Sequence, residues 1–244
     1  PFDTSRAGVY GDPAWIAKAR AFAAPPPWQG LPPPPPVTFY DGFEHTDVGS
    51  RPSRAYSRVE GKGDNIEVTE ETAATGKRSL KITDAPGLEH GFNPHFSYAP
   101  NHREGITTFS FDVRMEQGAE LSLEWRQQPG KPHYYIGPKL LFRNGQLTFA
   151  DQPPLPLPLG VWTHIEISAG FGSKTDGTWQ LTVTTPGAEP KHFSGLKFVN
   201  PETRSVTWLG FISVANCKGV YYIDNVKLET DFVEEARALG ADVK

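Results

Sequence analysis

The side chains best suited to bind a polar ligand alternate with apolar ones along two neighbouring runs, residues 107–116 and 120–127. The segment 117–119, which contains Gly118, predicts a tight hairpin between them. This pairing would bring four charged side chains into one patch: Asp112, Arg114, Glu124 and Arg126. The next run, residues 133–142, extends the patch with a second group: His133, Tyr135 and Lys139. We predict that these seven side chains form a ligand-binding surface.

Two other interpretations of the same polar residues stay open. The outer face of a sandwich alternates polar with apolar residues whatever its function, so the patch also fits a merely solvated sheet. The stretch that holds His90, His95 and His102 is rich in loop residues, and the spacing of its histidines matches no zinc site. We expect these three to be surface histidines, with a binding loop as the alternative.

Composition excludes several classes of function. The formal net charge is −4, and the 24 Lys and Arg are scattered, so no basic stripe predicts nucleic-acid binding. No apolar run approaches the roughly 20 residues that a membrane-spanning helix needs. The single cysteine, Cys217, leaves no partner for an internal disulfide.

The elements that must position these residues are short strands. The chain has 24 Gly and 24 Pro, and they separate apolar runs with a period of two. Ten runs are predicted as strands: 37–43, 76–84, 107–116, 120–127, 133–142, 146–149, 161–169, 178–184, 206–214 and 220–228. This pattern predicts an all-β, two-sheet antiparallel jelly-roll sandwich. The tryptophans on apolar strand faces are expected in its core: Trp125, Trp162, Trp179 and Trp208.

The chain divides into three segments. Residues 1–36 are predicted as an N-terminal extension with a short helix over 14–23 and a proline-rich linker. Residues 37–229 form the sandwich. In residues 230–244 the apolar side chains of Phe232, Ala236 and Leu239 recur at helical spacing, which predicts a short C-terminal helix or a tail.

Three motifs carry a family resemblance: residues 41–44 (DGFE), 76–82 (GKRSLKI) and 221–228 (YYIDNVKL). Together they resemble the framework of jelly-roll carbohydrate-binding modules and related concanavalin A-like (LamG-like) domains, over residues 37–229. The resemblance implies a polysaccharide ligand on a concave sheet, held by aromatic stacking and charged groups, in a secreted or cell-surface bacterial protein. Residues 1–15 resemble the end of secreted parallel β-helix proteins, which implies a β-helix domain before this chain.

The same resemblance implies a metal site. In many such modules a first-strand Glu and a last-strand Asp help to hold a structural calcium ion, and the matching positions here are Glu44 and Asp224. Carboxylate and carbonyl oxygens are the ligands that Ca²⁺ prefers. The alternative is that both carboxylates lie at strand ends in water and bind nothing.

Catalysis is the main alternative to binding. Jelly-roll polysaccharide lyases use an Arg or Gln to neutralise a uronate and use Tyr and His as acid and base, roles that Arg126, Tyr135 and His133 match by residue type. A retaining glycosidase of this fold would need alternating acids on one strand, and no run here has them. We therefore predict a non-catalytic polysaccharide-binding module. A lyase or hydrolase, or a structural or adhesion domain without glycan binding, are the alternatives.

Overall fold

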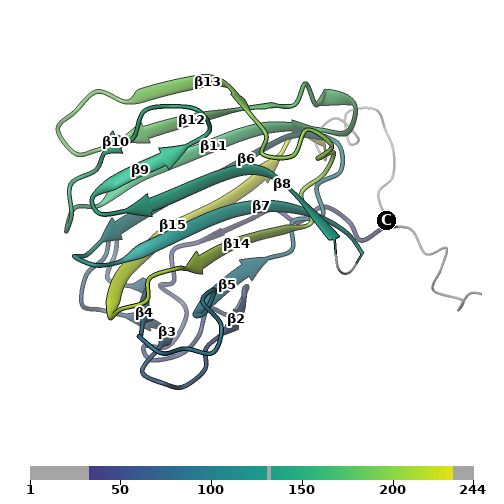
Figure 1. Cartoon of the computed structure of the whole chain (residues 1–244). Coiled ribbons are helices and arrows are strands. Elements are labelled where there is room, and N and C mark those ends of the chain that lie inside the picture. Colours follow the sequence, from purple (N-terminus) through teal and green to yellow (C-terminus); the bar gives the residue numbers. More distant parts are fainter. Residues whose placement is uncertain (1–32, 131–132, 233–244) are drawn as a thin grey trace, which may run out of the picture. The chain divides into compact units, whose positions relative to one another are not determined.

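Most of the strands are apolar on one face only, and the sequence folds so that two such faces bury each other. The structure is a computed structural model that describes residues 33–130 and 133–232 (Figure 1). An eight-stranded antiparallel sheet, sheet A, packs on a seven-stranded antiparallel sheet, sheet B. The predicted all-β sandwich is thereby confirmed.

The strand order shows which residues each sheet can bring together. Across sheet A the order is β13 (Lys191–Lys197), β12 (Thr178–Thr184), β11 (Thr163–Phe171), β6 (Gly105–Met115), β15 (Gly219–Thr230), β4 (Ser79–Asp84) and β3 (Asn65–Thr69), with β1 (Phe39–Asp41) also paired to β15. Across sheet B the order is β10 (Leu155–Pro156), β9 (Gln146–Phe149), β8 (His133–Arg143), β7 (Glu120–Gly130), β14 (Trp208–Ser213), β5 (His95–Tyr98) and β2 (Tyr56–Arg58). A 3-10 helix, η3 (Gly172–Lys174), follows β11.

All ten predicted runs contain strands, and five further strands were not predicted: β2, β3, β5, β10 and β13. Four of the five have five residues or fewer, and the fifth, β13 (KHFSGLK), is largely exposed. Their alternation is too short or too weak to stand out from the neighbouring loops.

The predicted hairpin between residues 107–116 and 120–127 is wrong. β6 pairs with β11 and β15 in sheet A, whereas β7 pairs with β8 and β14 in sheet B. Each run has a fully apolar face, Phe109 and Phe111 on β6 and Leu121 and Leu123 on β7, and all four side chains are buried. The chain therefore crosses from one sheet to the other between the two strands. Their apolar faces meet across the core and their polar faces point to opposite sides of the sandwich.

Aromatic rings from both sheets fill the core. Phe211 of β14 stacks on Phe96 of β5 with ring centroids 4.5 Å apart, and it meets the edge of Phe111 of β6 at 5.0 Å. Trp125 packs edge-on against Phe109 at 6.2 Å. Burial of each such ring stabilises the fold by about 2–3 kcal/mol.

The core confirms part of the prediction for the tryptophans. Trp125 and Trp179 are buried, as expected, but Trp162 and Trp208 are only half-buried and lie outside the core cluster.

Three predicted features lie wholly or mostly outside the described residues: the helix at 14–23, the proline-rich linker and the C-terminal helix. In the part of the chain that is described, no helix has the length and apolar character needed to cross a membrane.

Candidate functional site

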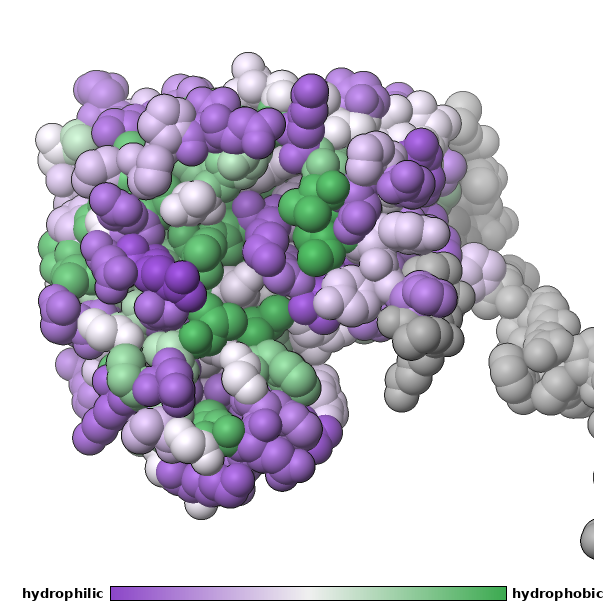
Figure 2. Space-filling view, viewed as in Figure 1, coloured by the Kyte–Doolittle hydropathy of each residue, from purple (hydrophilic) through white to green (hydrophobic). Residues whose placement is uncertain are grey.

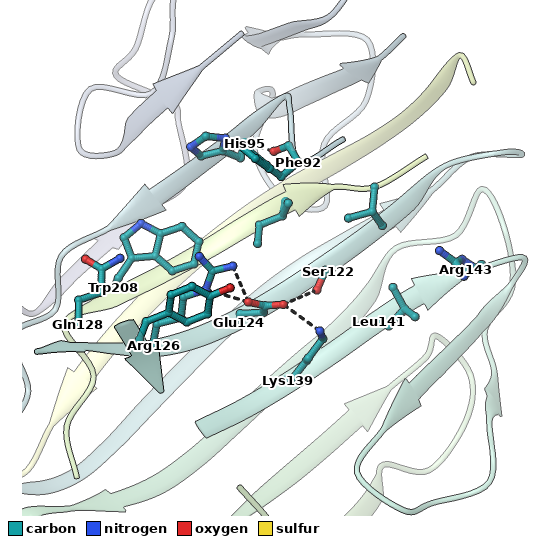
Figure 3. A pocket seen from close by; sticks show the side chains of 13 residues that line it. Phe92, His95, Ser122, Glu124, Arg126, Gln128, Lys139, Leu141, Arg143 and Trp208 are labelled. Atoms are coloured by element: carbon teal, nitrogen blue, oxygen red, sulfur yellow. Dashed lines mark hydrogen bonds and ion pairs between the residues drawn. The ribbon is translucent and has the colours of Figure 1, made fainter. Parts of the chain in front are cut away.

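The outer face of sheet B is hollowed into a groove of about 650 Å³. In the space-filling view, hydrophobic side chains lie across the middle of this face and hydrophilic ones surround them (Figure 2). Side chains of β7, β8 and β14, together with the segment that leads into β5, line the groove (Figure 3): Phe92, His95, Ser122, Glu124, Arg126, Gln128, Tyr134, Lys139, Leu141, Arg143, Trp208, Ile212 and Val214.

Glu124 lies at the floor of the groove with two cations bound to it. Arg126 contacts its Oε2 through Nε at 2.8 Å and Nη2 at 2.6 Å, and Lys139 Nζ contacts its Oε1 at 2.9 Å. The hydroxyl of Ser122 donates to the same Oε1 at 3.2 Å. Burial raises the pKa of Glu124, but the hydrogen bonds and charges of Lys139 and Arg126 outweigh it and leave the pKa below its ordinary value. Glu124 is therefore an ionised carboxylate at neutral pH.

Two aromatic rings hold Arg126 in place. Its guanidinium carbon lies 4.3 Å from the ring centroid of Tyr134 and 4.3 Å from that of Trp208. Such cation–π contacts fix the plane of the guanidinium as well as stabilising its charge. Trp208 in turn lies flat over Gly210, where an added Cβ would come within 1.9 Å of the indole ring.

The structure brings three of the seven predicted binding residues into the groove: Glu124, Arg126 and Lys139. Alternation along β7 and β8 places them on one face, with Glu124 directly opposite Lys139. The other two predicted residues of β8 are not among those that line the groove. The β7–β8 register shifts between Glu124 and Arg126, so Tyr135 pairs with Gln127, the neighbour of Arg126 that points to the other face. His133 lies exposed at the start of β8.

Asp112 and Arg114 lie on sheet A, away from the groove, because β6 belongs to that sheet. Asp112 accepts hydrogen bonds from His164 Nδ1 at 2.7 Å and from Asn225 Nδ2 at 2.6 Å. The hydrogen bond with Asp112 raises the pKa of His164, although burial opposes it. Arg114 binds Glu116 at 2.7 Å. Asp112 and Arg114 thus make separate polar contacts on sheet A.

Residues that were not predicted complete the groove. Tyr134, Arg143 and Trp208 were missed, and Phe92 and His95 lie in the loop-rich stretch whose histidines were expected at the surface. Only His95 carried a signal in the sequence, as a member of the alternative binding loop. His102 of the same stretch is fully buried and bonds Thr107 Oγ1 at 2.8 Å, so the surface prediction is wrong for it.

A second hollow adjoins the groove at β8. It has a volume of about 500 Å³ and shares Lys139 and Leu141 with the first. Asp151, which follows β9, and Lys197 at the end of β13 also line it.

Glu44 and Asp224, the predicted calcium ligands, both accept hydrogen bonds from backbone amides. Glu44 Oε1 accepts from the amides of Lys77 and Arg78 at 2.8 and 2.9 Å. Asp224 Oδ2 accepts from Ala74 and Thr75 at 2.9 and 3.2 Å, and its Oδ1 accepts from Asn225 at 2.7 Å.

These five N–H groups occupy some of the lone pairs of the two carboxylates, and a calcium ion would have to compete with them. Among the described residues, no group of three or more His, Cys, Asp or Glu side chains could hold a metal. Calcium binding remains a prediction of the resemblance. A melting temperature that rises when calcium is added to chelator-treated protein, but not in the Glu44→Gln variant, would confirm it.

No family model and no curated protein matches the chain. Solved structures do match. An endo-β-1,4-glucuronan lyase from the fungus Trichoderma reesei is 15% identical, with 80% of this chain and 95% of that chain covered and a TM-score of 0.53. An alginate lyase from Aplysia kurodai is 15% identical over 75% of this chain and 97% of that chain, with a TM-score of 0.52. The cellulose induced protein Cip1 is 14% identical over 78% of this chain and 96% of that chain, with a TM-score of 0.54. At these identities the similarity shows the jelly-roll fold.

Proposed function

We propose that the groove on sheet B binds an acidic polysaccharide. The observation that carries this proposal is the unequal exposure of its charges. The side chains of Lys139 and Arg143 are 40% and 48% exposed, whereas that of Glu124 is 7% exposed. Arg126 and Lys139 cover Glu124, and Arg143 binds Glu120, whose side chain is 20% exposed. In both clusters the cation is the more exposed partner, so positive charge faces the groove although the chain as a whole carries −4.

The shape and the apolar surface of the groove support a sugar polymer as this acidic ligand. The apolar side chains of Leu141, Ile212 and Val214 and the rings of Trp208 and Tyr134 line the groove together with the charged ones. Sugar rings offer apolar faces to such surfaces and hydroxyl groups to the charged side chains. The second hollow, which shares Lys139 and Leu141 with the groove, adds room for a chain of sugars.

The names of the structural neighbours point to the same class of ligand. Two of the three are lyases named for glucuronan and alginate, and both polymers are built from uronic acids. A carboxylate on every sugar would match the exposed ammonium of Lys139 and guanidinium of Arg143.

A panel of neutral, uronate and sulfated polysaccharides tests the proposal. We expect retention of the protein on uronate polymers and little on neutral ones, with affinity that falls as salt rises, because exposed charge pairs are screened. Equal retention on neutral polymers would contradict the charge argument. No retention on any polymer would favour a structural domain.

A lyase is the second candidate, because the groove holds the three residue types that β-elimination requires: His95, Arg126 and Tyr134. In this reaction a base takes the proton from C5 of a uronate and the C5–H electrons form the C4=C5 double bond. The C4–O bond breaks, and the departing oxygen receives a proton from an acid. Arg126 would neutralise the carboxylate, His95 would act as base and Tyr134 as acid. They replace His133 and Tyr135, the pair expected from residue type.

The absorbance of the C4=C5 product decides between binding and elimination. If the protein is a lyase, uronate polymers give this absorbance and Tyr134→Phe lowers the rate about 100-fold or more. Tyr135→Phe is the matched control and leaves the rate unchanged. Retention without product leaves the binding function, and a Tyr135→Phe variant that loses activity contradicts the assignment of Tyr134.

A further inference from the structure

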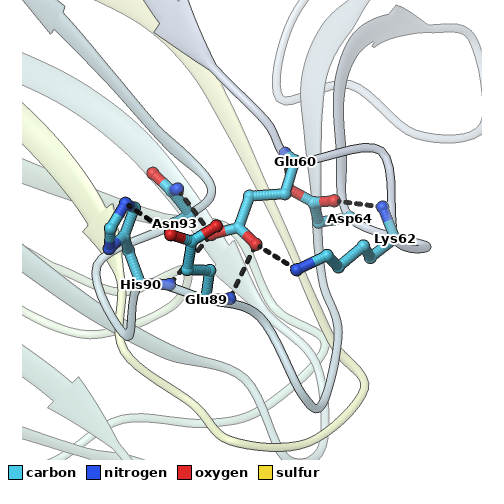
Figure 4. Close-up of polar contacts among 6 residues, drawn as sticks. All are labelled: Glu60, Lys62, Asp64, Glu89, His90 and Asn93. Carbon is cyan, nitrogen blue, oxygen red and sulfur yellow. Dashed lines mark hydrogen bonds and ion pairs between the residues drawn. The ribbon is translucent and has the colours of Figure 1, made fainter.

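Glu60 binds the segment that forms one wall of the groove (Figure 4). Its carboxylate accepts hydrogen bonds from the backbone amides of Glu89 at 2.7 Å and His90 at 2.9 Å, and from the side-chain amide of Asn93 at 2.8 Å. Lys62 Nζ adds a further contact at 3.1 Å. The hydrogen bonds from Asn93 and the backbone amides lower the pKa of Glu60 to about 2, so it is a carboxylate at neutral pH.

An ionised carboxylate accepts hydrogen bonds and donates none, so Glu60 determines how the Asn93 amide is oriented. The NH₂ group of Asn93 must face Glu60, and its carbonyl oxygen Oδ1 then faces the other way. That oxygen lies 2.9 Å from Nδ1 of His95. Asn93 is 1% exposed, which keeps water from competing for either contact.

His95 meets two acceptors through the same ring nitrogen. Besides Asn93 Oδ1, its Nδ1 lies 3.2 Å from the carbonyl oxygen of Phe92. Both partners can only accept, so Nδ1 must carry the proton. In the neutral ring Nε2 then has a free lone pair. Nε2 has no hydrogen-bond partner among the residues that the structure describes, and the ring lines the groove (Figure 3).

We propose that Glu60 and Asn93 are positioning residues that fix His95 as the Nδ1–H tautomer, so that its Nε2 accepts a hydrogen bond from a hydroxyl group of the bound glycan. This proposal rests on the proposed binding function. It adds to the groove an acceptor that is not a charge, whereas Arg126, Lys139 and Arg143 can only donate.

The groups around His95 keep its ring neutral. Burial is the main reason that the pKa of His95 lies below its ordinary value. The hydrogen bond with the Phe92 carbonyl opposes this shift, and the charges of Arg58 and Arg126 add to it. The rings of Tyr56 and Phe92 pack beside it, with centroids 6.2 and 5.9 Å away. Glu60, the nearest carboxylate in this network, reaches His95 only through the neutral amide of Asn93.

Nitrogen NMR of the ring tests the tautomer directly. In a long-range ¹H–¹⁵N spectrum at neutral pH, we expect His95 to show a protonated Nδ1 and an unprotonated Nε2. Free histidine in water favours the opposite tautomer. The His95 signals are identified by their loss in the His95→Gln variant. A protonated Nε2 with a bare Nδ1, or a fully protonated ring, would overturn the proposal.

Addition of a uronate oligosaccharide tests the acceptor role. We expect the Nε2 resonance to move toward the protonated range while Nδ1 stays protonated, since Nε2 accepts a hydrogen bond from the ligand. If calorimetry shows binding and Nε2 does not move, the acceptor role is wrong and the binding function stands. If calorimetry shows no binding to any glycan while the Nδ1–H tautomer is present, the binding function fails instead.

The Glu60→Gln variant tests the positioning role, because a glutamine cannot accept from all four donors. We expect a mixture of His95 tautomers and glycan binding that is about three- to ten-fold weaker, the loss of roughly one hydrogen bond. Glu229→Gln is the matched control, since Glu229 also binds a lysine, Lys227 at 2.9 Å, but lies on sheet A. Unchanged tautomer and affinity in Glu60→Gln would contradict the positioning role. Should that variant not fold, the spectrum of the wild-type ring still tests the His95 tautomer on which the proposal depends.

Discussion

At the scale of single residues, Glu124 and Arg126 determine the charge of the groove. A carboxylate that is 7% exposed is tolerated only because Arg126 and Lys139 both bind it. The arrangement stabilises the ionised form of Glu124, and it holds both cations at fixed positions in the groove. The groove therefore presents positive charge in a defined geometry.

Substitutions of Glu124 and Arg126 should have strongly coupled effects on the free energy of unfolding. We expect Arg126→Met to lower the free energy of unfolding by about 3 kcal/mol, because Glu124 is left buried with one cation partner fewer. The double variant Glu124→Gln/Arg126→Met should recover part of that loss. Urea unfolding of the wild type, both single variants and the double variant measures the coupling. Additive effects of the two substitutions would show that the pair is not coupled.

His164 on sheet A gives a pH dependence with a definite sign. Asp112 raises the folded-state pKa of His164 above its unfolded value, so the pair stabilises the fold fully below about pH 6.5 and the effect is lost as pH rises through the folded pKa. His164→Asn should remove this part of the stability profile. Urea unfolding from below about pH 6.5 to above the folded-state pKa of His164 measures this loss of stability, with His192→Asn as the control. A profile that is identical in wild type and His164→Asn contradicts the assignment.

At the scale of elements, β14 shapes the groove as much as β7 and β8 do. Gly210 lies on this strand beneath the indole of Trp208, and the missing Cβ is what allows the ring to lie flat. The flat ring then covers one face of the Arg126 guanidinium. A glycine inside a strand often marks a place where another group approaches closely.

Gly210→Ala should therefore disturb the groove without unfolding the sheet. The new methyl group would push the Trp208 ring away from β14 and from Arg126. We expect a change in tryptophan fluorescence and glycan affinity about three- to ten-fold lower, with loss of one cation–π contact. Gly195→Ala is the control, at a glycine with no atom within 4 Å of an added Cβ, although its φ of +67° adds local strain. An unchanged affinity in Gly210→Ala would show that Trp208 does not support the site.

The strands themselves were largely predictable, but their assignment to sheets was not. A period of two identifies which residues share a face of one strand, so Glu124 and Arg126 could be placed together from the sequence. It does not identify which sheet the next strand joins. Asp112 and Arg114 were therefore grouped with them although β6 crosses to sheet A. The register shift between β7 and β8 likewise explains why Tyr134, and not the predicted Tyr135, lines the groove. Such an irregularity of pairing cannot be detected in the alternation of polar and apolar residues.

At the scale of the whole sandwich, the two polar faces differ in the side chains that they expose. Sheet A carries closed networks of side chains such as Asp112 with His164 and Asn225. Sheet B carries the groove, with exposed cations, aromatic rings and a histidine whose Nε2 faces no partner among the described residues. The core separates the two faces, so substitutions on the outer face of sheet A, such as Arg114→Gln, should leave ligand binding unchanged.

The affinity of a uronate polysaccharide for two matched variants tests this account most directly. Lys139 on sheet B and Arg114 on sheet A are both cations bound to a glutamate, at 2.9 and 2.7 Å. We predict that Lys139→Gln weakens binding about ten-fold and that Arg114→Gln leaves it unchanged, as measured by calorimetry at low salt. Weaker binding in Arg114→Gln with none lost in Lys139→Gln would place the ligand on the other sheet and contradict the account.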